Sequence, residues 1–271
     1  MRWRLGATGY YNRGWRGAFF PPGLPQSKWL SHYATRFDAI ELNATFHAAP
    51  TRQRVRDWAA KVPDDFRFSL KAPRAVTHDV ALKDAADPLA AFLESAVEMG
   101  PKLGAVLLQF GPHHGVGELP ALERLLAGLP HDEVRFAVEF RDASWLVPPV
   151  YRALRAHGAA LVAADLDDLP AAAGIVPTAD FLYVRLLGKH GRFESEDHEL
   201  FDPTPRLTWW RDRLQRAIAS GRFGEGGPAT AWVLSNNDFA GHAPATLRRF
   251  AGLTGVSLPG DEAKAQADLF D

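Results

Sequence analysis

The chain has 271 residues, of which 46% are hydrophobic and 23% are charged, and its formal net charge is -1. This composition is typical of a globular protein, and the near-neutral charge argues against a protein that holds nucleic acid mainly by bulk electrostatics. The absence of cysteine excludes disulfides, thiolate nucleophiles, iron-sulfur clusters and thiolate zinc sites.

Eight short apolar runs, each ending in a polar or ionisable residue, recur along the chain with helix-like stretches between nearly all of them. They cover residues 4–10, 39–46, 67–73, 105–110, 135–141, 159–165, 181–188 and 229–237. Strand followed by helix, eight times, predicts an α/β fold, a closed (β/α)8 barrel of the TIM type, because parallel strands need helical crossovers. Such a barrel needs about 250 residues, so we expect one domain over residues 1–254 and a flexible C-terminal tail over residues 255–271.

The connections between these elements differ in length on the two sides of the predicted barrel. Helices are expected over residues 26–37 and 51–62, the second with Thr51 as its N-cap. The longest connections, residues 11–25, 72–87 and 188–205, all follow strands, which indicates a binding surface on the C-terminal rim. The sequence contains no apolar run of membrane-spanning length and no apolar signal core at its start, so we expect a cytoplasmic protein with no membrane partner.

Polar residues at the strand ends are the candidate site, because barrel enzymes carry their chemistry at the C-terminal ends of the strands. Glu41 and Asn43 are two residues apart, as are Glu139 and Arg141, so each pair points to one side of its strand. Apolar neighbours would face the helices, which leaves both pairs facing the barrel axis. The candidate substrate-binding residues are Tyr10, Asn43, His78, Gln109, Arg141, Asp165, Arg185, His190 and Asn236.

Two interpretations of the charged residues stay open, and both can hold at once. In one, they form a salt-bridged layer in which Glu139 neutralises Arg141 or Lys71. Glu41 would then neutralise Arg185. In the other, Glu41, Glu139 and Lys71 are catalytic, with one glutamate as general base and Lys71 helping Arg185 to clamp an anion.

The ligand that suits such a site is anionic or polyhydroxylated, for example a phosphorylated sugar or a nucleic-acid backbone. This predicts a hydrolase of phosphate esters or nucleic acid, and the cationic loop at residues 189–192 would help to grip the anion. Sugar hydrolysis or isomerisation by Glu41 and Glu139 is an alternative that depends on the separation of the two carboxylates.

No cofactor is indicated by the sequence. It contains no Walker-type phosphate loop, no Gly-x-Gly-x-x-Gly and no Gly-x-Ser-x-Gly, which argues against nucleoside triphosphatases, classical dehydrogenases and serine esterases. A metal would need histidine and carboxylate ligands, and none of these shows a close ligand spacing. We therefore expect no essential metal, and a divalent metal is the less favoured alternative.

Several segments in fixed order carry a family resemblance. They are WRGAFFP at residues 15–21, FDAIELNATF at 37–46, FSLKAP at 68–73, LQF at 108–110, AVEFR at 137–141 and YVR at 183–185. Together they resemble the YecE-like family, which implies a TIM-type barrel with no established activity and supports a shared site at the polar strand ends. His47 departs from this pattern, because the family commonly has an aromatic residue such as tyrosine there. The family's barrels are also broadly similar to a metal-dependent abasic-site endonuclease, which makes DNA repair an analogy at the level of the fold.

The C-terminal sequence resembles the short peptide by which bacterial replication and repair proteins bind the sliding clamp. Gln266, Asp268, Leu269 and Phe270 match that motif, while Ala267 stands where leucine is preferred. Leu269 and Phe270 would enter an apolar pocket of the clamp. The alternatives are a hydrophobic end tucked against the barrel and a non-catalytic module that binds DNA or a clamp.

Overall fold

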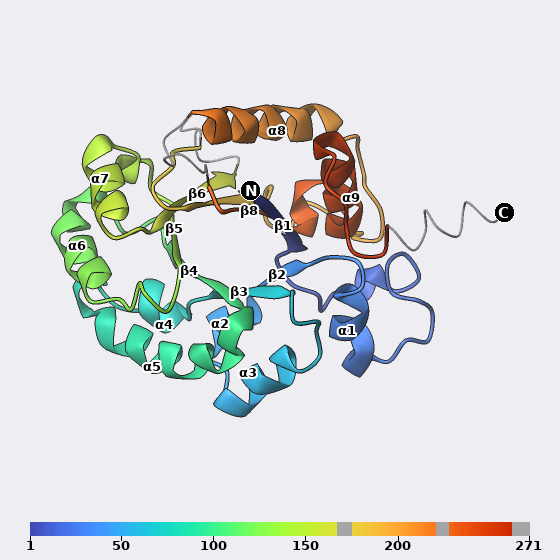
Figure 1. Ribbon diagram of the computed structural model, residues 1–271, viewed down its shortest axis with the longest axis horizontal. Coiled ribbons are helices and arrows are strands. Elements are labelled where there is room, and N and C mark those ends of the chain that lie inside the picture. The colour runs from blue at the N-terminus through green and yellow to red at the C-terminus, as the bar shows by residue number, and fades with distance from the viewer. Residues whose placement is uncertain (167–174, 221–227, 262–271) are drawn as a thin grey trace.

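Eight parallel strands form one sheet that curls into a barrel, as the computed structural model shows (Figure 1). The structure describes residues 1–166, 175–220 and 228–261. Around the barrel the strands follow the order β1-β8-β7-β6-β5-β4-β3-β2, so the predicted (β/α)8 architecture is confirmed. The strands are β1 (Arg2–Ala7), β2 (Ala39–Leu42), β3 (Arg67–Lys71), β4 (Leu103–Phe110), β5 (Phe136–Phe140), β6 (Ala160–Asp165), β7 (Phe181–Leu186) and β8 (Thr230–Ser235).

Helices surround the strands on the outside of the barrel (Figure 1). They are α1 (Trp29–Tyr33), α2 (Ala44–His47), α3 (Arg52–Ala59), α4 (Arg74–Thr77), α5 (Ala86–Ala96), α6 (Leu119–Ala127), α7 (Pro148–Ala156), α8 (Thr204–Ala219) and α9 (Ala243–Thr254). Thr51 is the N-cap of α3, as predicted, and its Oγ1 accepts a hydrogen bond of 3.2 Å from the amide of Arg54. No helix in the described part of the chain is long and apolar enough to cross a membrane.

The alternation of side chains along the strands produces two separate cores. One lies between the sheet and the helices and includes Val138 and Phe140 of β5. The other lies inside the barrel, where small residues such as Ala137 leave room for Tyr183 and Trp232. The barrel is therefore a packed core, and a ligand must bind at one of its two ends. The inner core consists of Ala39, Ala105, Leu107, Ala137, Ala160, Val162, Phe181, Tyr183, Trp232 and Leu234.

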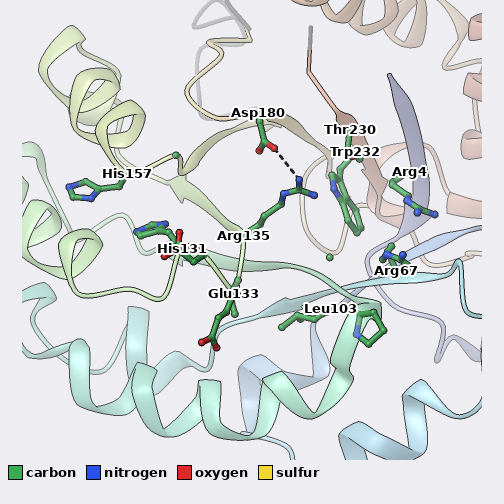
Figure 2. Close-up of a pocket in the computed structure, with 15 residues that line it drawn as sticks. Arg4, Arg67, Leu103, His131, Glu133, Arg135, His157, Asp180, Thr230 and Trp232 are labelled. Atoms are coloured by element: carbon green, nitrogen blue, oxygen red, sulfur yellow. Dashed lines mark hydrogen bonds and ion pairs between the residues drawn. The ribbon is translucent and has the colours of Figure 1, made fainter. Parts of the chain in front are cut away.

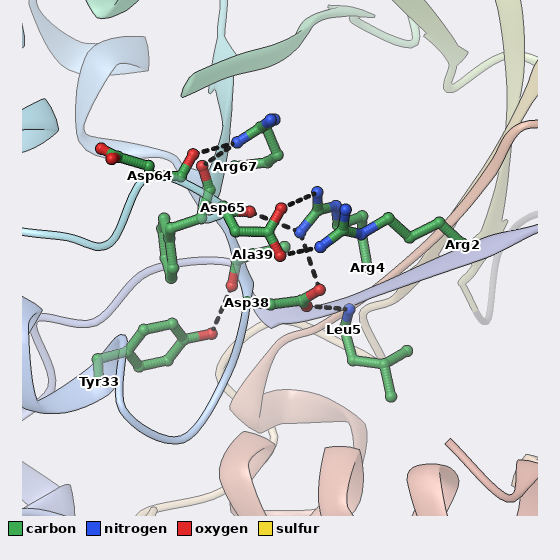
Figure 3. Close-up of polar contacts among 10 residues, drawn as sticks. Arg2, Arg4, Leu5, Tyr33, Asp38, Ala39, Asp64, Asp65 and Arg67 are labelled. Carbon is green, nitrogen blue, oxygen red and sulfur yellow. Dashed lines mark hydrogen bonds and ion pairs between the residues drawn. The ribbon is translucent and has the colours of Figure 1, made fainter. Parts of the chain in front are cut away.

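The seam between β1 and β2 is held by side chains, and no backbone ladder joins these two strands among the described residues (Figure 3). The Tyr33 hydroxyl accepts a hydrogen bond of 2.7 Å from the amide of Ala7 and donates one of 3.0 Å to the carbonyl of Ala39. The strands approach closely at Gly6, where a Cβ atom would lie 2.1 Å from the Ala39 carbonyl oxygen. Glycine is therefore required at this point of the seam.

The long connections lie after strands, as the sequence predicts. The chain between β7 and α8 contains no helix or strand over residues 187–203, all of which are described. The connection after β3 is more ordered than expected, because residues 72–87 include the short helix α4. The run at 39–46 also differs from its prediction, since the strand ends at Leu42 and the chain turns into α2. There Thr45 Oγ1 lies 2.8 Å from the Leu42 carbonyl oxygen and 2.6 Å from that of Lys71.

Candidate functional site

Arg185 of β7 is the centre of a buried ion cluster inside the C-terminal end of the barrel. Its side chain is only 2% exposed. Its Nη2 donates to Glu41 Oε1 and its Nη1 donates to Glu139 Oε2, both over 2.6 Å. Burial by itself lowers the pKa of Arg185, but the two carboxylates outweigh it and raise that pKa above its ordinary value. The guanidinium is therefore permanently charged and bridges β2 to β5 through the barrel interior.

Each glutamate of the cluster has a second partner. Glu41 Oε2 accepts a hydrogen bond of 2.8 Å from the Tyr183 hydroxyl. Glu139 Oε1 accepts one from Arg141 Nε. Burial raises the pKa of Glu139, but Arg185 and Arg141 together bring it below its ordinary value. The predicted salt-bridged layer is present, because Glu41 pairs with Arg185 and Glu139 pairs with Arg141.

Lys71 lies at the end of β3 and behaves differently from the two arginines. It forms no ion pair with any described residue, so the predicted alternative pairing with Glu139 is absent. Its Nζ lies 4.0 Å from the centre of the Phe46 ring. Burial and the neighbouring charge of Arg185 lower the pKa of Lys71 to about 8. The amine therefore changes charge near physiological pH.

A cavity of about 350 Å³ opens over this cluster. Four of its lining residues carry cationic side chains, and Asn43 and Asn236 add amides. Asn43 Oδ1 is buried and accepts no hydrogen bond from a described residue, so it is available to a donor in the cavity. Asn236 Oδ1 is already used, because it accepts a hydrogen bond of 2.6 Å from the amide of Asp238. The lining consists of Asn43, Lys71, Arg141, Leu166, Arg185, Leu187, Gly188, Lys189, His190 and Asn236.

A smaller cavity of about 230 Å³ shares Asn43, His190 and Asn236 with the first one. The imidazole of His190 is 99% exposed at the rim, and its Nδ1 lies 3.3 Å from Asp238 Oδ2. These three residues, all of which the sequence predicted for the site, therefore lie between the two neighbouring cavities at the C-terminal mouth.

His78 and Gln109 lie beside the mouth without lining its cavity. His78 packs edge-on against Phe46, with 4.9 Å between ring centres, and its Nδ1 lies 2.8 Å from Thr77 Oγ1. Burial and the charge of Lys71 lower the pKa of His78 to about 4, so the ring is neutral at physiological pH. Gln109 donates to the Phe110 carbonyl over 3.0 Å. His78 therefore supports the wall that carries Phe46, and Gln109 Nε2 lies 3.5 Å from His78 Nε2 behind it.

Two predicted residues lie away from this cluster. Asp165 is directed to α8, where its carboxylate accepts hydrogen bonds from Arg206 and Trp210. Tyr10 lies beyond the end of β1 near Arg54 of α3, and its burial raises its pKa. Position at a strand end does not fix which way a side chain points: Asp165 anchors α8 to the barrel, whereas Tyr10 packs against the outer core.

Residues that were not predicted complete the site. Tyr183 and Ser69 join the buried cluster, with 2.6 Å between their hydroxyl oxygens, and Phe46 contacts Lys71. Tyr183 stands two residues before Arg185, and this spacing was the available signal for its inward direction. Lys189 lines the cavity and belongs to the cationic loop noted in the sequence.

Among the described residues, no group of three histidines or carboxylates is placed to hold a metal ion.

The predicted clamp-binding residues Gln266, Asp268, Leu269 and Phe270 lie outside the described residues. Their role stays a prediction.

The fold and the site define a parallel α/β barrel with a cation-lined cavity over a buried Arg185–glutamate cluster at its C-terminal mouth. The chain belongs to the family described as "Protein of unknown function DUF72", whose model matches residues 4–267. The predicted membership of the YecE-like family is thereby confirmed.

Two curated relatives and two solved structures illustrate this kinship. The chain is 36% identical over 129 residues to UPF0759 protein YecE of Escherichia coli K12, a match that covers 44% of this chain and 47% of that protein. It is 28% identical over 158 residues to UPF0759 protein YunF of Bacillus subtilis 168, covering 54% and 53%. The chain thus spans about half the length of the curated relatives it matches.

Solved structures match over nearly the whole chain. A DUF72 family protein from Thermotoga maritima MSB8 superposes with a TM-score of 0.72 at 26% identity, covering 94% of this chain and all of that one. A DUF72 family protein from Enterococcus faecalis V583 gives a TM-score of 0.67 at 18% identity, covering 94% and 98%. The second likeness is one of fold alone.

Proposed function

We propose that the chain binds a small anionic compound, bearing a phosphate or carboxylate group, in the cavity at the C-terminal mouth. The observation that carries this proposal is the division of charge around Arg185. The cavity is lined by cations, whereas Glu41 and Glu139 lie beneath it in ion pairs and do not line it. An entering ligand therefore meets positive charge that is only partly neutralised.

The balance of charges in the cluster supports an anion. Lys71, Arg141 and Arg185 supply three positive charges against the two negative charges of Glu41 and Glu139, which leaves a surplus of one. Lys189 adds another cation at the rim. Guanidinium groups bind phosphate and carboxylate oxygens through paired hydrogen bonds, and a lysine supplies a compact charge beside them.

The unpartnered Asn43 Oδ1 further restricts the chemical class of ligand that would fit this cavity. A buried carbonyl oxygen without a donor is costly, so the ligand that fits best carries a hydroxyl or amine beside its anionic group. A cavity of about 350 Å³ suits a compound of metabolite size. We therefore favour a phosphorylated or carboxylated polyhydroxy compound.

If the site is catalytic, Lys71 is the residue best placed to accept a proton. Both glutamates already accept hydrogen bonds on each of their oxygens. Lys71 has no carboxylate partner among the described residues and a pKa of about 8, so a fraction of its amine is neutral near physiological pH. We propose Lys71 as the general base and the buried glutamates as residues that position Arg185. A hydrolase acting on a phosphate ester is one reaction class consistent with these roles.

The test is anion binding as a function of pH, measured by calorimetry with sulfate at constant ionic strength. Sulfate keeps its charge over this range, so any pH dependence comes from the protein. For the wild type we expect the affinity to fall about tenfold or more between about pH 7 and about pH 9.5, because Lys71 loses its positive charge as pH rises through its pKa.

Two variants give this test its controls. Lys71→Arg keeps its charge and should bind sulfate equally well at both pH values, whereas Lys71→Met should bind weakly at both. Wild-type affinity that is independent of pH, or unchanged by Lys71→Met, would contradict the proposal.

A further inference from the structure

A second and larger cavity, of about 620 Å³, lies at the opposite end of the barrel, where the strands begin (Figure 2). Arg4, Arg67 and Arg135 line it from β1, from β3 and from the residue before β5. Trp232 of β8 closes its inner side. Neither the sequence motifs nor the proposed site at the other end involve this cavity.

Trp232 presents an unused hydrogen-bond donor to this cavity. The side chain is 2% exposed, and its ring stacks on Tyr183 inside the barrel with 6.0 Å between ring centres. Within the described part of the chain its indole Nε1 has no acceptor. An indole N–H is a donor only, and this Nε1 is not among the fully buried atoms that lack a partner, so it is accessible from the cavity. A ligand acceptor in the cavity would supply that partner.

Gly104 at the start of β4 brings the indole and Arg67 onto one wall. A Cβ atom at residue 104 would lie 2.4 Å from Trp232 Cζ2 and 3.2 Å from Arg67 Cβ. Any larger residue would therefore displace the indole, so the wall with its N–H and its guanidinium depends on a glycine at this position.

Arg67 is the cation of this wall that lacks a counterion. Its Nη1 donates to two backbone carbonyls, those of Asp64 at 2.7 Å and Phe66 at 2.9 Å, and it pairs with no carboxylate among the described residues. Arg4, in contrast, is neutralised by Asp38 and Asp65 (Figure 3). Burial and the charge of Arg2 lower the pKa of Arg67, and the more distant charge of Asp38 opposes them only in part.

None of the other carboxylates that line the cavity forms an ion pair with Arg67. Asp180 is paired with Arg135 over 3.0 Å. Asp132 and Glu133 are exposed, and the Glu133 carboxylate points away from Arg67 and Trp232 (Figure 2). The positive wall therefore remains open to an anion from solution.

We propose that the N-terminal cavity is a second ligand site, which binds an organic phosphate or carboxylate through the Arg67 guanidinium and the Trp232 indole N–H. Arg135 flanks the same anionic group. The cavity volume lies within the usual range for small-molecule sites and leaves room for an organic portion beside one oxyanion. This site is independent of the one at the C-terminal mouth.

The indole N–H resonances of the full chain, labelled with ¹⁵N at tryptophan, provide the test. The chain has eight tryptophans, and Trp232→Phe assigns one resonance by removing the N–H while keeping a ring. Titration with inorganic phosphate at constant ionic strength should move the Trp232 resonance to saturation. Arg67→Met should weaken this response at least tenfold, while exposed Arg152→Met should leave it within about twofold.

The remaining indole resonances show whether Arg67→Met is still folded. Lys71→Met alters the cavity at the C-terminal mouth and should leave the Trp232 response unchanged. The proposal for each site can therefore be refuted without refuting the other. A Trp232 resonance that does not move, or that moves equally in folded Arg67→Met, would overturn the proposal.

Discussion

At the scale of single residues, one guanidinium holds the buried charges together. Arg185 satisfies an oxygen of Glu41 and an oxygen of Glu139 at the same time. Removing one partner of a buried ion pair destabilises a protein far more than replacing all its charged groups by neutral ones, because the charge that remains is desolvated and unpaired. We therefore expect the loss of the Arg185 guanidinium to destabilise the barrel strongly.

Arg185→Met should reduce the free energy of unfolding by about 3–5 kcal/mol, because it strands two buried carboxylates. Neutralising both carboxylates in the same chain, with Glu41→Gln and Glu139→Gln, should recover most of that loss. Urea denaturation of the single and triple variants measures both effects. Arg141→Met should reduce the free energy of unfolding by less than Arg185→Met, because Glu139 keeps its ion pair with Arg185. A triple variant as unstable as the single one would show that packing around Arg185, and not charge, sets the loss.

The sequence predicted the members of this cluster where alternation along a strand decides their direction. Glu41, Glu139 and Arg185 are buried together as expected. Asp165 also ends a strand, yet its carboxylate accepts hydrogen bonds from Arg206 and Trp210 of α8. The direction of this side chain therefore depends on a helix that is remote in the chain. Distances within the cluster, and the choice of Arg185 over Lys71 as the partner of Glu139, likewise follow from tertiary packing.

At the scale of secondary structure elements, the weakest joint of the barrel is the seam between β1 and β2. One hydroxyl, that of Tyr33, joins the amide of Ala7 to the carbonyl of Ala39 in place of a backbone ladder. Tyr33 is fully buried, and burial raises its pKa, so the hydroxyl stays protonated and can donate. Closure of the barrel thus depends on a helix residue inserted between two strands.

Tyr33→Phe should reduce the free energy of unfolding by about 2–4 kcal/mol, because it leaves a buried amide and a buried carbonyl without partners. Amide hydrogen exchange should also quicken at Ala7, whose N–H loses its acceptor. The matched control is Tyr151→Phe on α7, where the hydroxyl has no hydrogen bond to a described residue, and it should change stability by less than about 0.5 kcal/mol. Equal effects of the two variants would contradict this account of the seam.

Element prediction succeeded where patterns were long and failed where they were short. The eight apolar runs each overlap a strand, because strand-length apolar segments alternate regularly with helices. Helices α2 and α4 have four residues each, too few for a periodic signal. The turn into α2 is set by Thr45, which contacts the Lys71 carbonyl on the neighbouring strand, a contact that sequence spacing does not reveal.

At the scale of the whole molecule, the two ends of the barrel are connected by stacked rings. Trp232 borders the N-terminal cavity and stacks on Tyr183, whose hydroxyl donates to Glu41 of the C-terminal cluster. The inner core between the two cavities is packed with apolar side chains. The two cavities therefore have no lining residue in common, and the packed core separates them.

The distribution of surface charge favours small anions over duplex DNA. Arginines crowd the start of α3, but Arg52 pairs with Glu94 and Arg56 pairs with Glu98. The cations of the C-terminal mouth line a cavity of about 350 Å³, which the phosphates of an intact duplex cannot enter together. We therefore expect these two regions to neutralise few phosphates of a duplex at once.

A 20-base-pair duplex should bind more weakly than about 10 μM at about 150 mM salt, with a log-log salt slope no steeper than about -2. Fluorescence anisotropy over a salt series measures both quantities. Glu94→Gln with Glu98→Gln frees Arg52 and Arg56, and should steepen the slope by up to about 2, one unit for each released cation. That variant shows that the assay can detect added phosphate contacts. A wild-type slope of about -5 or steeper would instead place an extended nucleic-acid surface on this barrel, because each neutralised phosphate contributes about -0.9 to the slope.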